Sequence, residues 1–216
     1  MVKVAHDTGL EAWVGAWGIA GLFGGEGLTA LRHLCPQSCR VQDELKRWTE
    51  VVVESGAEGA FLDEPRNRCC SVQGILFDLT FVLSQAGIQT HLCLSPEHPW
   101  PDMLMLKGQL TSVGTDPYSV FRPELELVPY IDDWATEAKR AAKDAGAKTH
   151  GWVRGFSVPA GQEDAIALSL KLWATAGVDR VGVWGYRPER VGTLANEQPE
   201  VVWTTICDAI DRLKGS

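Results

Sequence analysis

Apolar residues along this chain fall into two patterns, short continuous runs and longer segments with helical spacing. The clearest helical segment, VQDELKRWTEVVVESG, carries Val41, Leu45, Trp48 and Val52 at intervals that place them on one helix face. Gly56 follows this segment, and a glycine just beyond the last turn is a common helix end. The pattern predicts an amphipathic helix that packs against a core and ends at this glycine.

The same order of a short apolar strand, a polar loop and an amphipathic helix recurs along the chain. A helix end at residues 2–12 precedes the first strand, and a short helical turn is expected at 101–110. Strands are predicted at 13–23, 59–65, 88–99, 110–118, 149–159 and 179–187. Further helices are predicted at 41–56, 70–87, 127–146, 162–177 and 201–215.

Strands that alternate with helices at this spacing imply right-handed crossovers and a parallel sheet. The fold class is therefore α/β, either a TIM-barrel-like (β/α) repeat or an open doubly wound sheet. We favour the barrel, because the glycine-rich turn after the first strand, GLFGGEGL, does not match the G-x-G-x-x-G pattern of a dinucleotide site. Residues 1–216 are expected to form one domain.

A complete barrel has eight units, and the sequence pattern shows six. Because the chain opens on the end of a helix, the first two strands of the cycle are the ones expected to be missing. A truncated start, a partner chain that completes the barrel and an incomplete fold that stands alone all remain open. An open barrel has two unpaired strand edges, so we expect a homo-oligomer or covering segments at the gap.

Charge and composition narrow the range of partners. The formal net charge is −8 and the pI is near 5.1, which disfavours nucleic acid and anionic membranes and suits a neutral or cationic ligand. The start of the chain has no basic and apolar leader, and no long apolar run is present, so a cytoplasmic location is expected. The six cysteines are expected to be reduced thiols.

The carboxyl ends of parallel barrel strands converge on the ligand site. Acidic residues follow four successive predicted strands, and aromatic residues lie among them. Carboxylates act as acid, base or nucleophile at a glycosidic bond, and aromatic faces stack on sugar rings. The catalytic candidates are Glu64, Asp116, Asp63 and Glu26, and the substrate-binding candidates are Trp17, Tyr118, Arg154, Trp184 and Tyr186.

One strand end carries a family resemblance. FLDEP, with Glu64, is similar to the Asn-Glu-Pro signature that ends strand four of retaining (β/α)8 glycoside hydrolases, in which the Glu is the acid/base. With two strands missing before Trp13, FLDEP falls on strand four and Trp184 on strand eight, where that superfamily often places a Trp. The resemblance departs at strand seven, which has no acid before Glu163, and at Asp63, where the family has Asn.

Three functions fit these residues. The first is a glycoside hydrolase with Glu64 as general acid/base and Asp116 or Glu26 as its partner, without any cofactor. The second is a divalent-metal-dependent sugar isomerase or lyase on the same barrel. The third is a non-catalytic carbohydrate-binding barrel. Each candidate also has a structural explanation, since an acidic pair before proline can cap a helix and Asp116 lies in an ordinary turn sequence.

Overall fold

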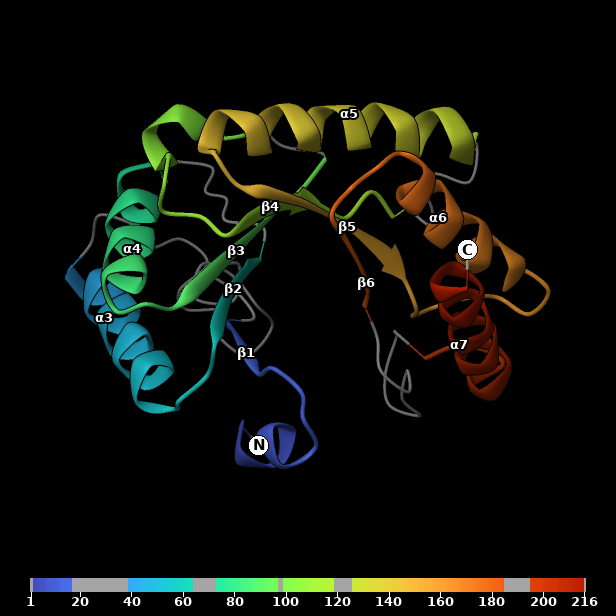
Figure 1. Ribbon diagram of the computed structural model, residues 1–216, viewed down its shortest axis with the longest axis horizontal. Helices are drawn as coiled ribbons and strands as arrows, with labels where there is room; N and C mark the ends of the chain where they lie inside the picture. Colours follow the sequence, from blue (N-terminus) through green and yellow to red (C-terminus); the bar gives the residue numbers. More distant parts are fainter. Residues whose placement is uncertain are drawn as a thin grey trace. The chain divides into compact units, whose positions relative to one another are not determined.

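A computed structural model describes residues 2–16, 39–63, 73–96, 99–118, 126–184 and 195–215. Six strands alternate with helices along these residues (Figure 1). The strands are β1 (Trp13–Ala16), β2 (Gly59–Asp63), β3 (Gln89–Leu94), β4 (Ser112–Thr115), β5 (Lys148–Arg154) and β6 (Arg180–Trp184). The helices are α1 (Val2–Asp7), α3 (Cys39–Glu54), α4 (Gln73–Gln85), α5 (Leu127–Ala145), α6 (Asp164–Thr175) and α7 (Pro199–Lys214), with a 3-10 turn η2 (Met103–Leu106).

The hydrogen-bonded strand order is β1-β2-β3-β4-β5-β6, which is the order along the sequence. Parallel pairing aligns Trp13 with Gly59 and Gly59 with Gln89, and β5 and β6 are also parallel. A doubly wound sheet reverses its strand order at a switch point, whereas a barrel adds each strand beside the previous one. The chain is therefore an α/β protein with the strand-helix repeat of a TIM barrel, as the sequence pattern predicts.

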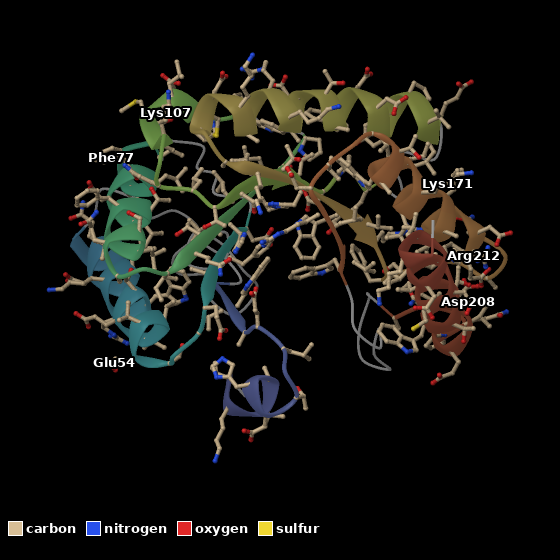
Figure 2. The ribbon with its side chains drawn as sticks, in the orientation of Figure 1. Glu54, Phe77, Lys107, Lys171, Asp208 and Arg212 are labelled. Carbon is tan, nitrogen blue, oxygen red and sulfur yellow. The ribbon has the colours of Figure 1, made fainter. Side chains whose placement is uncertain are left out.

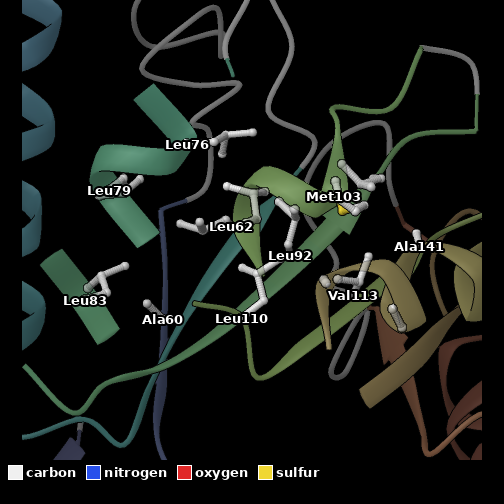
Figure 3. Close-up of a cluster of buried hydrophobic side chains, with 14 of the residues drawn as sticks. Ala60, Leu62, Leu76, Leu79, Leu83, Leu92, Met103, Leu110, Val113 and Ala141 are labelled. Carbon is white, nitrogen blue, oxygen red and sulfur yellow. The ribbon is translucent and has the colours of Figure 1, made fainter. Parts of the chain in front are cut away.

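The chain divides into two compact units. The first consists of Met1–Val113 and Ala141–Ala147, and the second of Gly114–Arg140 and Lys148–Ser216. In the first unit, helices α3 and α4 lie side by side and cover one face of the strands (Figure 1). Figure 3 shows leucines of α4 pointing toward leucines of β2 and β3, including Leu62 and Leu92, which are fully buried.

The second unit has its own core between β5, β6 and helices α6 and α7. Val153 of β5 packs with Ile166 and Trp173 of α6 and with Val202 of α7, all buried. Helix α6 approaches β5 closely at Gly151, where a Cβ atom would lie 2.3 Å from the Trp173 ring. Only glycine fits beneath this indole, so the small residue in the strand fixes how closely the helix packs.

Helix ends agree with the sequence pattern. Gly56 after α3 has a φ of 72° and Gly146 after α5 has a φ of 66°, both in the left-handed region that glycine adopts at low cost. Strand β4 ends at Thr115, before the end of the predicted run 110–118. Asp116 and Pro117 do not join the ladder, and proline has no N–H to donate to it.

Among the described helices, none combines the length and the apolar character needed to cross a bilayer. Cys93 is buried in β3, and Cys207 is half-buried in α7. Side chains such as Glu54 of α3 and Phe77 of α4 point away from the strands of their unit (Figure 2).

Candidate functional site

Five predicted site residues lie within the described chain, each at or just after a strand end. Asp63 ends β2, in the first unit. Asp116 and Tyr118 follow β4, Arg154 ends β5 and Trp184 ends β6, all in the second unit. The second unit therefore gathers one carboxylate, one guanidinium and two aromatic rings at the carboxyl ends of its strands.

The other predicted site residues lie outside the described residues. These are the two catalytic candidates Glu64 and Glu26 and the two substrate-binding candidates Trp17 and Tyr186. Their roles stay predictions from the sequence.

The two faces of β5 have different environments. Val153 belongs to the hydrophobic core of the second unit, and Gly151 abuts Trp173 of α6, so this face is turned toward the helices. Side chains alternate along a strand, so Trp152 and Arg154 start from the opposite face. The strand thus separates a helix-packing face from a face that carries aromatic and charged groups.

Trp152 is the centre of an aromatic group on that face. Its ring centroid lies 6.3 Å from that of Trp184 with the planes at 77°, and 6.2 Å from that of His150 with the planes at 85°. The Trp152 ring also lies over Gly182 of β6, where a Cβ atom would come within 2.6 Å of it. Edge-to-face contacts of this kind fix ring orientation, which leaves Trp184 a defined, half-buried ring at a strand end.

Tyr118 links the end of β4 to the loop after β5. Its ring meets that of Phe156 edge to face, with centroids 5.3 Å apart and planes at 87°. Tyr118 also lines a pocket with Trp152 and Arg154 of β5. The rest of its wall comes from Gln162 and Ser169 and from core residues such as Ile131, Val153, Ile166 and Trp173. The pocket holds about 30 Å³, room for only one or two water molecules, so it suits a substituent and not a sugar ring.

Arg154 is half-buried at the end of β5. Burial lowers the pKa of its guanidinium from 12.5 to about 10, so the group is still a cation at neutral pH. Its Nη1 atom is buried and has no hydrogen-bond partner among the described residues. The site therefore contains a partly desolvated positive charge.

The loop after β5 is held by a buried side chain. Asn196 accepts a hydrogen bond from the Val158 N–H (2.8 Å) and donates one to the Gly155 carbonyl (3.0 Å). Ser157 in this loop has a φ of 47°. Among the described non-glycine residues, no other has a positive φ. Strained backbone of this kind persists where its surroundings hold it, and it clusters at functional sites.

The strands of the first unit also carry a polar group. Asp63 lies opposite Cys93 of β3, with its carboxylate within 4.8 Å of the thiol. Two residues earlier, the buried His91 ring stacks on Trp13 with centroids 3.6 Å apart, and His91 Nδ1 lies 2.7 Å from the Ser112 hydroxyl. In the first unit, the predicted catalytic residue Asp63 therefore lies beside the thiol of Cys93.

Sequence reasoning missed Trp152, His91 and Asn196 as parts of these groups. The alternation in GWVRGF carried a signal for Trp152, since it shares a strand face with the predicted Arg154. No comparable signal existed for Asn196, whose partners lie 38 and 41 residues earlier in the chain.

The fold defines a class, that of α/β proteins with the strand-helix repeat of a TIM barrel. No protein-family model matches this chain, and no curated protein matches it. Solved structures do match its fold. A class V chitinase from Pseudomonas fluorescens has a TM-score of 0.62 and 12% sequence identity over 97% of this chain and 83% of that chain.

Two further enzymes show the same likeness. An endo-1,4-beta-mannanase from Rhizomucor miehei has a TM-score of 0.61 and 11% identity, covering 100% of this chain and 75% of its own. The PgaB glycoside hydrolase domain from Bordetella bronchiseptica has a TM-score of 0.57 and 10% identity, covering 98% and 76%. At these identities the likeness is one of fold.

Proposed function

We propose that this chain is a glycoside hydrolase-like enzyme that acts on a carbohydrate or a glycoside. The observation that carries the proposal is the set of side chains at the strand ends of the second unit. There a carboxylate, Asp116, follows β4, and the aromatic rings of Tyr118 and Trp184 lie at the ends of β4 and β6. The fold shared with solved chitinase and mannanase structures supports this assignment.

In the proposed reaction, Glu64 is the general acid/base that protonates the glycosidic oxygen. Asp116 is its partner, with Glu26 as the second choice and Asp63 as the neighbouring carboxylate of Glu64. A pair of carboxyl groups about 5.5 Å apart would form a covalent intermediate and retain the anomeric configuration, whereas more than about 6.5 Å would admit a water molecule and invert it. The Trp184 ring supplies a surface on which a sugar can stack.

Turnover of aryl glycosides tests the proposal. We expect wild-type protein to release the aryl group, Glu64→Gln to abolish this activity, and Asp116→Asn to lower kcat by about 10²-fold or more while leaving the fold intact. Glu54→Gln and Asp208→Asn are matched controls, because both carboxylates are exposed on outer helix faces (Figure 2). Full activity in Glu64→Gln would refute the proposed acid/base.

A non-catalytic carbohydrate-binding barrel is the second candidate. The feature that favours it is Arg154, which ends the strand that corresponds to strand seven in the proposed register, where the superfamily places its nucleophile Glu. No acid follows Arg154 in the sequence until Glu163 at the start of α6. Sugar binding by wild-type protein without turnover of any aryl glycoside would favour this candidate.

A further inference from the structure

We propose that Arg154 binds an anionic substituent of the carbohydrate, so that the substrate class is a sugar that carries a carboxylate or a sulfate group. This inference rests on the proposed carbohydrate function and adds the charge of the ligand to it.

The first step is the position of Arg154. It is the last residue of β5, and ligands of parallel barrels bind at such strand ends. It lines the same pocket as Tyr118 and lies two residues from Trp152, whose ring contacts Trp184. Arg154 thus shares a pocket with Tyr118, one of the proposed stacking rings.

The second step is the state of the charge. Among the described residues, Arg154 forms no ion pair, and its buried Nη1 has no hydrogen-bond partner. Burial is the cause that lowers its pKa. A desolvated cation is costly, and an anionic ligand group would lower that cost.

Arg140 of the same unit shows the contrasting case. Its guanidinium pairs with the Glu137 carboxylate one turn earlier on α5, and its side chain is exposed. The charge of such an exposed arginine is already balanced by its carboxylate partner and by solvent. It therefore provides a matched control for Arg154.

The third step is the size and lining of the pocket. A volume of about 30 Å³ accommodates a small group such as a carboxylate and excludes a sugar ring. Much of its wall is apolar, including Ile131, Val153 and Trp173, and Gln162 and Ser169 add neutral hydrogen-bonding groups. The planar guanidinium of arginine matches a carboxylate or sulfate in a two-pronged hydrogen bond, which a lysine does not reproduce.

The net charge of −8 limits how far this preference extends. The average surface repels polyanions, so one buried cation favours a single anionic group at one position and not a highly charged polymer. The preference is consequently a local property of the pocket.

Sugar pairs that differ in one anionic group test the inference. The probes are glucuronate against glucose, galacturonate against galactose, and N-acetylglucosamine 6-sulfate against N-acetylglucosamine, titrated by NMR on the tryptophan indole N–H signals. We expect at least one acidic sugar to bind about 10- to 100-fold more tightly than its neutral partner, the range of one charge-assisted hydrogen-bond pair. The carboxylate and sulfate arms identify which anionic group the pocket prefers.

Three variants keep the test independent of misfolding. Arg154→Gln should bind both members of the preferred pair equally, and Arg154→Lys should keep a reduced preference for the acidic member because the charge remains. Arg140→Gln should leave all affinities within about twofold, as expected for an exposed pair.

The outcomes separate the two proposals. Equal binding of neutral and acidic sugars by wild-type protein, or a preference that survives in Arg154→Gln, would overturn the inference and leave the carbohydrate function standing. Binding of none of the six sugars, together with no turnover of aryl glycosides, would overturn both.

Discussion

The indole rings of Trp152 and Trp184 meet edge to face on neighbouring parallel strands, with centroids 6.3 Å apart. Trp152 can reach across to β6 because Gly182 leaves the space that its ring occupies. The aromatic surface at the end of β6 therefore depends on a residue without a side chain, and this dependence can be tested directly.

Gly182→Ala should displace the Trp152 ring, because the added Cβ would lie 2.6 Å from it. We expect a loss of about 1–3 kcal/mol in the free energy of unfolding, the usual cost of overpacking, and weaker binding of neutral sugars. Urea unfolding and NMR titration measure the two effects. Gly74→Ala adds the same methyl group in α4, where no atom lies within 4 Å, and should stabilise by about 0.5–1 kcal/mol.

Leu62→Ala should leave a cavity in the core of the first unit, since Leu62 is fully buried among the leucines of Figure 3. The free energy of unfolding should fall by about 2–5 kcal/mol. Leu104→Ala, at a leucine of η2 that is 62% exposed, should change it by no more than about 0.5 kcal/mol. Equal losses in the two variants, measured by urea unfolding, would contradict the packing described for this core.

Asn196→Ala should loosen the loop after β5, because the Val158 N–H and the Gly155 carbonyl would lose their partner. We expect a loss of about 1–3 kcal/mol in the free energy of unfolding and faster proteolysis within residues 155–163. Gln198→Ala, an exposed residue without a side-chain hydrogen bond to its helix, is the control. Unchanged proteolysis in Asn196→Ala would show that other contacts hold the loop.

The Asp179 carboxylate joins the start of β5 to the segment before β6 and should make stability depend on pH. It accepts hydrogen bonds from the Thr149 N–H and hydroxyl, both 2.7 Å long, and the backbone bond is the larger cause of its lowered pKa. The folded pKa lies below the ordinary value of 3.8, so the stabilisation is complete above that pH and is lost as the pH falls through the folded value.

Asp179→Asn should therefore be less stable than wild-type protein at pH 7, and the difference should shrink below about pH 4. Urea midpoints measured between pH 7 and pH 2.5 follow this change. Asp208→Asn makes the same chemical change on the exposed face of α7, away from Thr149. A difference for Asp179→Asn that stays constant down to pH 2.5 would contradict the hydrogen-bonded arrangement.

The repeat of strands and helices was predictable because burial imposes it on the sequence. Leu45 and Val52 recur at helical spacing since one side of α3 faces a core, and Gly56 follows because its left-handed backbone suits glycine. The starts of the strands were predictable to within about two residues. These features are local, so the chain itself carries them.

The contacts around the candidate site were not predictable in the same way. The ring of Trp152 over Gly182 and the two hydrogen bonds of Asn196 join residues 30 or more positions apart. The sequence presented Arg154 as a charge on a strand, without its depth of burial or the pocket beside it. Such facts depend on which side chains meet after folding.

The amino-acid order alone determined an α/β repeat and the list of acidic and aromatic residues that follow its strands, because periodicity and turn chemistry act over neighbouring positions. Only the tertiary structure decided that Tyr118 and Arg154 share one small pocket and that Arg154 has a buried nitrogen without a partner among the described residues. The physical reason is that the desolvation of a group depends on all the atoms packed around it. Those atoms come from distant segments of the chain.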